Sequence, residues 1–248
     1  MRARLKMDTH MRTKIFVLLV ILAGLLCSTA AFADDTILKV AAITGKVLVK
    51  IAPSTEWTAA SLGQALNPKD AIKTEAGAKT TLEFPNKSAF SLKPNSELTI
   101  DELIWNNVIK KVGVNLASGE LKAMIKKMDT PSDFKVKTPT AICGARGTTF
   151  YVIVFTDGTG VYVEDGLVDF LNTISGETYT VYKGMNSEVH ADGSVTPPRE
   201  LTKAEVDAII ADYDVEPVAE PYTEPEGARD DTDVIVPDVV PEQVASKT

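Results

Sequence analysis

The chain has 248 residues, of which 44% are hydrophobic, so it can bury one sizeable core or two small ones. Its formal net charge of −8 at pH 7 argues against a nucleic-acid binder. The charge is uneven: residues 34–198 carry 17 Lys and Arg against 19 Asp and Glu, whereas residues 199–248 carry 4 against 14. The body is therefore nearly neutral and the C-terminal segment is acidic.

The N-terminal residues have the organisation of an export signal. Basic residues precede an apolar run at 15–26, and an Ala-Phe-Ala tripeptide at 31–33 matches a signal-peptidase site. We therefore predict a signal peptide over residues 1–33 and a periplasmic or secreted protein. The alternative is an inner-membrane anchor, because the uncharged stretch 15–33 just reaches the roughly 18 residues that can span a membrane.

The body of the chain, residues 37–197, has the period-two alternation of β-strands. Gly, Pro and Asn separate the alternating segments, as expected for tight turns. The clearest alternating segments are 47–51, 78–84, 134–137, 161–164 and 168–171. Strands at a spacing of about 8–12 residues are typical of a sandwich or barrel. We predict an all-β domain, a β-sandwich or jelly-roll-like fold, over these residues.

The pattern changes after residue 198. Thr202 and Glu205 have the spacing of a capping box, which predicts a short C-terminal helix within residues 200–214. Its apolar stripe consists of Leu201, Val206, Ile209, Ile210 and Tyr213. Residues 215–248 combine Pro with Asp and Glu, which disfavours both helix and sheet, so we predict a disordered acidic tail.

Several fragments resemble one family in their order and spacing. In the first half they are Gly-Lys-Val at 45–47, Leu-Gly-Gln-Ala-Leu at 62–66 and Pro-Lys-Asp-Ala-Ile-Lys-Thr at 68–74. In the second half they are Ala-Ser-Gly-Glu-Leu at 117–121, Phe-Lys-Val-Lys-Thr-Pro at 134–139, Gly-Ala-Arg-Gly-Thr at 144–148 and Val-Glu-Asp-Gly-Leu-Val at 163–168. On these residues the chain resembles a FecR-domain protein, of the family named after the bacterial iron-dicitrate sensor regulator.

The resemblance implies an all-β domain outside the cytoplasm that acts by binding, not by catalysis. Signalling members of the family carry a cytoplasmic segment that holds a sigma factor, then one membrane helix, then the β domain. Only about 14 residues precede the apolar run here, so we expect the exported stand-alone form without the anti-sigma segment. Such a chain would be a binding, scaffold or signalling-accessory module at the bacterial cell envelope. The alternatives are a membrane-anchored sensor and regulator of the iron-dicitrate type, and a module that binds a surface polysaccharide.

The residues of the family motif are expected to be structural. They are Gly119, Thr138, Pro139, Gly144, Arg146, Gly147, Thr148 and Gly166. The glycines permit a positive φ. We expect Arg146 to cap carbonyl groups or to pair with an acid such as Asp165, and an anionic ligand is the alternative. Cys143 is expected to be a buried core residue, because a nucleophilic cysteine needs a nearby base.

One group of lysines, close together in the sequence, is a candidate binding surface. Its members are Lys110, Lys111, Lys122, Lys126, Lys127, Lys135 and Lys137. They could meet an anionic surface polymer, lipid headgroups or the acidic tail of the chain itself. The alternative is a set of solvated lysines without a specific partner.

Other residues are expected to have structural roles. The Asp-Gly pairs at 157–158 and 165–166 predict turns rather than calcium loops. The aromatic residues that could stack on a sugar are expected in the core, and they are Trp57, Trp105, Tyr151 and Tyr162. The sequence lacks the phosphate-loop, zinc-protease and serine-hydrolase motifs, so we expect no catalytic residue, cofactor or metal. The expected partner is an envelope protein or a surface polymer, and membrane contact is expected only if the signal is uncleaved.

Overall fold

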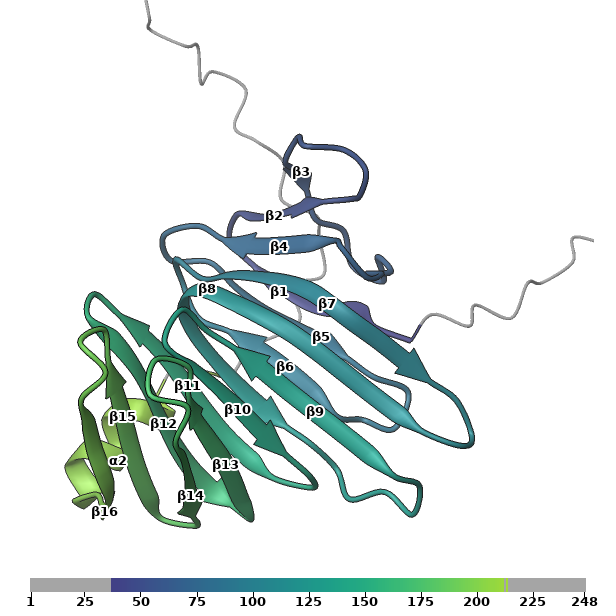
Figure 1. Cartoon of the computed structure of the whole chain (residues 1–248). Helices are drawn as coiled ribbons and strands as arrows, with labels where there is room; N and C mark the ends of the chain where they lie inside the picture. The colour runs from purple at the N-terminus through teal and green to yellow at the C-terminus, as the bar shows by residue number, and fades with distance from the viewer. Residues whose placement is uncertain (1–36, 212, 214–248) are drawn as a thin grey trace, which may run out of the picture. The chain divides into compact units, whose positions relative to one another are not determined.

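The computed structural model describes residues 37–211 and 213 of the chain, all within one folded unit. These residues form 16 strands and one short helix, α2 (Figure 1). The prediction of an all-β fold is confirmed, because alternating apolar side chains and glycine turns recur along this part of the chain. The first eight strands are β1 (Lys39–Thr44), β2 (Val47–Lys50), β3 (Thr58–Ala59), β4 (Ala71–Thr74), β5 (Lys79–Glu83), β6 (Ala89–Leu92), β7 (Glu97–Trp105) and β8 (Lys110–Met124). They are followed by β9 (Ser132–Lys137), β10 (Ala141–Ala145), β11 (Thr149–Phe155), β12 (Gly158–Asp165), β13 (Leu167–Asn172), β14 (Thr178–Tyr182), β15 (Met185–His190), β16 (Val195–Glu200) and α2 (Lys203–Ile210).

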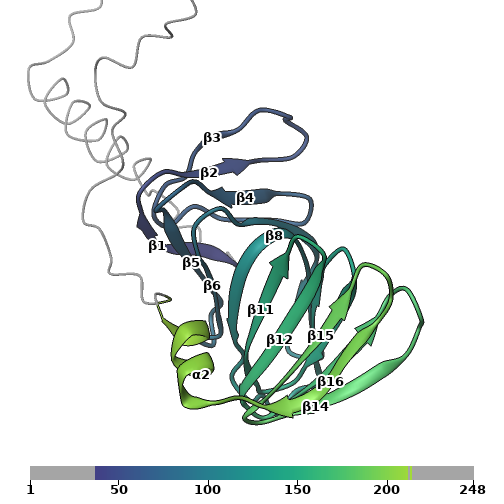
Figure 2. The ribbon, with the colours of Figure 1, turned by 90° about the vertical axis from the view of Figure 1, so that its left-hand side faces the viewer.

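The strands belong to two sheets that share the long strand β8. Sheet A has the order β1-β5-β6-β8-β11-β12-β15-β16, and every pair is antiparallel. Sheet B has the order β3-β2-β4-β7-β8-β9-β10-β13-β14. All its pairs are antiparallel except β8 and β9, which run parallel. Neighbouring strands of the two sheets can be followed in Figures 1 and 2.

Strand β8 passes from sheet B to sheet A at Gly119. Its first part, to Ser118, pairs with β7 and β9, and its second part pairs with β6 and β11. Gly119 has a φ of +86°, a conformation that glycine adopts without steric cost. The buried side chains change phase across this bend, from Val112, Val114 and Leu116 to Leu121 and Ala123. Both parts of β8 therefore direct their apolar side chains into one interior.

The bend in β8 also explains the parallel pairing of β8 with β9. A parallel pair needs a crossover connection of about a dozen residues or more. Here only residues 125–131 separate the two strands. Because the second part of β8 lies in the other sheet, this short loop is sufficient to return the chain to the beginning of β8.

One hydrophobic core lies between the sheets and draws on both halves of the domain. Phe84 stacks on Trp105 with ring centres 5.1 Å apart and meets Phe90 and Phe134 edge-on at 5.3 and 5.8 Å. Each fully buried Phe contributes about 1.5–3 kcal/mol relative to an exposed one. Cys143 is fully buried in the same core, as predicted.

Helix α2 lies against the outer face of sheet A (Figure 2). It begins with the predicted capping box: the Thr202 hydroxyl accepts from the Glu205 backbone N–H, and the Glu205 carboxylate accepts from the Thr202 backbone N–H at 2.8 Å. Tyr213 buries its ring against Tyr151 and Tyr162 beside the helix. Within the described residues, no helix is long and apolar enough to cross a membrane. The predictions for residues 1–33 and 215–248 lie outside the described residues.

Candidate binding surface on sheet B

The outer face of sheet B carries rows of exposed and half-buried side chains that cross β8, β9, β10, β13 and β14. The strand register places one residue of each strand in each row. The middle row is Gly113, Lys135, Gly144, Asp169 and Thr180, and the row beside it is Asn115, Lys137, Ile142, Leu171 and Thr178. The row on the other side contains the pairs Lys111 with Asp133 and Leu167 with Tyr182. The face thus mixes charged, polar and apolar side chains.

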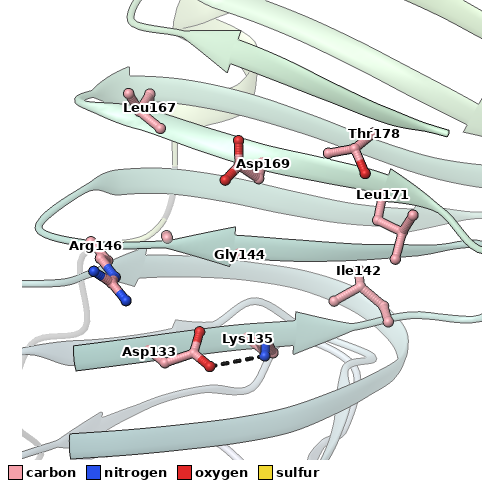
Figure 3. A pocket seen from close by; sticks show the side chains of 10 residues that line it. Asp133, Lys135, Ile142, Gly144, Arg146, Leu167, Asp169, Leu171 and Thr178 are labelled. Atoms are coloured by element: carbon pink, nitrogen blue, oxygen red, sulfur yellow. Dashed lines mark ion pairs between the residues drawn. The ribbon is translucent and has the colours of Figure 1, made fainter. Parts of the chain in front are cut away.

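A central hollow of about 590 Å³ opens in this face (Figure 3). It is lined by Asp133, Lys135, Ile142, Gly144, Ala145, Arg146, Leu167, Asp169, Leu171 and Thr178. Gly144 leaves space at its floor, because a Cβ there would have the Asp169 carbonyl oxygen, at 3.8 Å, as its nearest contact. The Lys135 ammonium pairs with the Asp133 carboxylate at 2.8 Å. The volume of the hollow lies within the range of ligand-binding pockets, and its lining mixes apolar with polar groups.

A second hollow, the loop hollow, has a volume of about 640 Å³ and lies at the end of β10. It is lined by residues 127–132 together with Arg146 and Gly147. Arg146 therefore contributes to both hollows. Its guanidinium group lies where the outer face of sheet B meets the loop between β8 and β9.

Within the described residues, Arg146 makes neither of the contacts predicted for it: its side chain caps no carbonyl group, and it does not pair with Asp165. The Arg146 side chain is exposed and makes no ion pair or hydrogen bond with any residue in the ranges 37–211 and 213. Asp165 instead pairs with Lys183 at 3.1 Å. The reason is topological: Arg146 continues β10 of sheet B on its outer side, whereas Asp165 ends β12 of sheet A.

The other motif residues lie at bends and turns of the strands. Gly147 and Gly166 have φ values of +59° and +88°, and a Cβ on Gly166 would lie 2.9 Å from the Thr148 hydroxyl. That hydroxyl donates to the Leu167 carbonyl at 3.0 Å. Gly144 differs from these residues, since a side chain would fit there. The structural role of the motif stays a prediction, and these contacts support it for Gly147, Thr148 and Gly166.

Thr138 and the exposed Pro139 form the turn between β9 and β10. The Thr138 hydroxyl accepts a hydrogen bond from the Ala141 backbone N–H at 3.0 Å and lies 2.8 Å from the Thr159 hydroxyl. Thr140 donates to the same Thr159 hydroxyl at 2.8 Å. Buried hydroxyl groups that bond one another in this way connect β12 of sheet A to a turn of sheet B.

The structure does not bring the seven lysines of the predicted basic surface together. Lys122 lies on the outer face of sheet A, 5.1 Å from the centre of the Tyr151 ring and 3.7 Å from the Glu164 carboxylate. Lys110 donates to the Thr130 hydroxyl at 2.8 Å. The remaining lysines lie on sheet B or in the loop after β8, and they are Lys111, Lys126, Lys127, Lys135 and Lys137. A single binding surface formed by all seven lysines stays a prediction, and the position of Lys122 on sheet A does not support it.

The aromatic residues do not form a common platform. Trp57 is flanked by Lys50 and Lys73, whose ammonium groups lie 4.8 and 4.9 Å from its ring centre. Trp105 packs in the core, and Tyr151 and Tyr162 are buried beside α2. The two Asp-Gly pairs lie at the two ends of β12, with Asp157 in the turn before the strand and Gly166 in the turn after it, as predicted. In the described part of the chain, no group of three or more His, Cys, Asp or Glu could hold a metal ion.

Sequence reasoning missed a contact that joins Tyr213, which follows helix α2, to β8. Tyr213 donates to the Glu120 carboxylate at 3.3 Å, and the Lys93 ammonium lies 4.5 Å from the Tyr213 ring centre. Lys93 also pairs with Glu120 at 2.9 Å. Burial, and then the neighbouring Glu120, raise the pKa of Tyr213 far above its usual value. Tyr213 and Glu120 are 93 positions apart, so no local pattern could have revealed this contact.

Comparison with known proteins agrees with the sequence motifs. Residues 70–169, which contain β4 to the middle of β13, match the model of the FecR protein family. Two crystal structures of a candidate anti-sigma factor from Parabacteroides distasonis ATCC 8503 are similar at 16% sequence identity and a TM-score of 0.47. The alignments cover 56% of this chain and 63% and 62% of those chains, so this chain spans less than two thirds of their length. No curated protein matches the sequence. This chain therefore contains a FecR domain, which is matched over residues 70–169.

Proposed function

We propose that this protein is a non-enzymatic binding module with a signalling or regulatory role, exported to the bacterial cell envelope. In this proposal a protein partner binds the outer face of sheet B, over the central hollow at Gly144. The observation that carries the proposal is the hollow itself, which combines apolar side chains with charged groups on an exposed sheet face. Eight of its ten lining residues lie within the family match. The FecR family supports a regulatory role rather than catalysis.

The composition of the hollow favours a protein partner over a polysaccharide. Sugar-binding sites usually stack the sugar ring on an aromatic side chain, and none of the ten lining residues is aromatic. Apolar contacts at Ile142, Leu167 and Leu171 would exclude water, while the polar groups around them would orient the partner. Such a division between apolar contacts and polar surroundings is common at protein interfaces.

The polar groups of the hollow favour binding over catalysis. Its two carboxylates belong to Asp133, which pairs with Lys135, and Asp169, which accepts from the Thr180 hydroxyl at 3.2 Å. The lining contains neither histidine nor cysteine, the usual residues of nucleophilic and general-base catalysis. Export is supported by the basic and apolar N-terminal sequence, and both a cleaved signal and a retained anchor would place the β domain outside the cytoplasm.

A Gly144→Tyr substitution tests the proposed site. The side chain would enter the hollow without disturbing the backbone, because a Cβ at this position meets only ordinary contacts. Gly113→Tyr is the matched control: it lies two strands away in the same row and does not line the hollow. Tagged full-length variants are expressed with their N-terminal segment and crosslinked in cells to partner proteins.

We expect the wild type and Gly113→Tyr to capture the same envelope protein and Gly144→Tyr to lose it. Equal capture by all three proteins would contradict the proposed site. Export is tested separately by fusing alkaline phosphatase, which is active only outside the cytoplasm, after residue 213. An inactive fusion that is present in the cell at normal levels would contradict the proposed location.

A further inference from the structure

We propose that the acidic C-terminal segment, residues 214–248, binds the loop hollow beside Arg146 and Lys127 as an internal ligand. This inference goes beyond the proposed function, since it concerns a contact of the chain with itself and holds whether or not an outside partner exists. Three observations carry it: unneutralised cations, the charge of the segment, and the place where the described structure ends.

The loop hollow contains cations without a counterion. Arg146 and Lys127 both line it, and neither side chain makes an ion pair or hydrogen bond within residues 37–211 and 213. The backbone brings them together, because a Cβ on Gly147 would lie only 2.5 Å from Lys127 Cγ. The exposed neighbour Lys126 has no side-chain partner in the same ranges.

The acids around these cations are too few to neutralise them. Asp129 is the carboxylate that lines the loop hollow. Asp133, on the neighbouring strand, is already paired with Lys135 at 2.8 Å. Residues 110–155 as a whole contain eight Lys and Arg and three Asp and Glu, a net charge of +5. An anionic ligand is therefore favoured here over a neutral or cationic one.

The C-terminal segment has the complementary charge. Residues 214–248 contain ten Asp and Glu and two Lys and Arg, a net charge of −8. Glu-Pro pairs recur at 216, 220 and 224, so carboxylates are spread along the segment. The repeated prolines favour an extended backbone, which suits binding along a row of cations.

The beginning of the segment is held close to the site. Tyr213 packs on Tyr151 with ring centres 5.0 Å apart and is bonded to Glu120, on the second part of β8. Lys127 follows Glu120 by seven residues, about 23 Å of extended chain. The 35 residues after Tyr213 can span up to about 115 Å, so the segment reaches the loop hollow with ample slack. A tether of this kind gives an effective concentration on the order of millimolar.

Several weak ion pairs have to act together in this contact. An exposed ion pair contributes at most about 1 kcal/mol and is screened by salt. The tethered segment is therefore expected to bind at low ionic strength and to dissociate at high ionic strength. Because Arg146 also lines the central hollow, a bound segment would compete with an acidic partner at that hollow.

The test measures binding of a fluorescent peptide of residues 214–248 to a chain that ends at Tyr213. This shortened chain keeps every described strand, helix α2 and the whole core. Fluorescence anisotropy is expected to show binding at about 50 mM salt and loss of binding by at least about tenfold at about 300 mM salt. The full-length chain should bind the peptide about tenfold more weakly, because its own segment occupies the site.

Charge reversal locates the site. Arg146→Glu combined with Lys127→Glu should weaken peptide binding by about tenfold or more. Lys39→Glu combined with Lys46→Glu is the matched control: both are exposed, neither has a side-chain partner within the described residues, and both lie outside the loop hollow. Circular dichroism verifies that both double variants fold.

Two results would overturn the inference. One is no peptide binding to the shortened chain at low salt. The other is equal loss, or no loss, of binding in the two double variants. The Gly144→Tyr variant separates this inference from the proposed function, since Gly144 does not line the loop hollow. A shortened chain with this substitution should bind the peptide normally, even though the full-length variant fails to capture a partner.

Discussion

The bend of β8 at Gly119 makes a sharp prediction for stability. In a Gly119→Ala variant the new Cβ would lie 2.6 Å from Ser96 Cβ and would overlap the Ser96 Cα atom. The Cα atom belongs to the backbone and cannot move aside as a flexible side chain could. The Ser96 side chain is also held in place by two hydrogen bonds. Its hydroxyl donates to the Lys93 carbonyl at 2.8 Å and accepts from the Glu120 backbone N–H at 2.9 Å.

Two costs therefore add at Gly119. A φ of +86° costs an alanine about 1–2 kcal/mol. Crowding in a packed interior costs about 1–3 kcal/mol more. We expect Gly119→Ala to lower the free energy of unfolding by about 2–5 kcal/mol, which would move a urea midpoint by about 1–2 M.

Two other glycines separate these costs. Gly77 has a φ of +72° with nothing within 4 Å of a Cβ, so Gly77→Ala should show the conformational cost alone. Gly113 lies in β8 without a positive φ, and a Cβ there would lie 3.4 Å from Glu102 Cβ. Gly113→Ala should change stability by less than about 1 kcal/mol. Urea unfolding followed by circular dichroism measures all three, and a Gly119→Ala cost no larger than that of Gly77→Ala would refute the reasoning about the bend.

Three further predictions concern single side chains. Burial raises the pKa of the Cys143 thiol and excludes solvent from it. When Cys27, the other cysteine of the chain, is replaced by serine, a thiol reagent should therefore label the protein only after denaturation, and rapid labelling of the native protein would contradict this. Thr138→Val should cost about 1–3 kcal/mol in urea unfolding, because Thr159 and the Ala141 N–H lose a buried partner, whereas the exposed Thr178→Val should be nearly neutral. The raised pKa of Tyr213 means that the folded protein keeps a proton which the unfolded chain, with a tyrosine pKa of 10.0, releases as the pH rises. The stability from Tyr213 should therefore be complete below pH 10 and decline above it. Tyr213→Phe should show a smaller decline above pH 10, and identical pH profiles would count against the buried phenol.

Local alternation predicted much of the core correctly. Val47, Leu82, Phe134 and Phe170 were assigned to apolar faces from their period-two spacing, and all four are buried. The short helix at Thr202 was readable for the same reason, because a capping box involves residues only three positions apart. The motifs around Arg146 indicated the family, although Arg146 does not form the predicted pair with Asp165.

A signal for the bend in β8 was present in the sequence but is visible only with the fold in hand. The apolar positions 112, 114 and 116 are even and the positions 121, 123 and 125 are odd, with Gly119 between them. The same pattern would also fit two separate strands joined by a turn at Gly119. Only the pairing of one continuous strand with four neighbours shows that β8 belongs to both sheets.

The sequence by itself determined the β class, the buried faces and the helix cap, because each depends on residues close together in the chain. The family resemblance also came from the sequence, through the order and spacing of several short fragments. The tertiary structure alone decided which exposed groups become neighbours. It buried Tyr162 on the outer face of sheet A under α2 and Tyr213, separated Lys122 from the lysines of sheet B, and opened the hollow at Gly144. These outcomes depend on strand order and register, which are set by hydrogen bonds between distant segments and leave no trace in local periodicity.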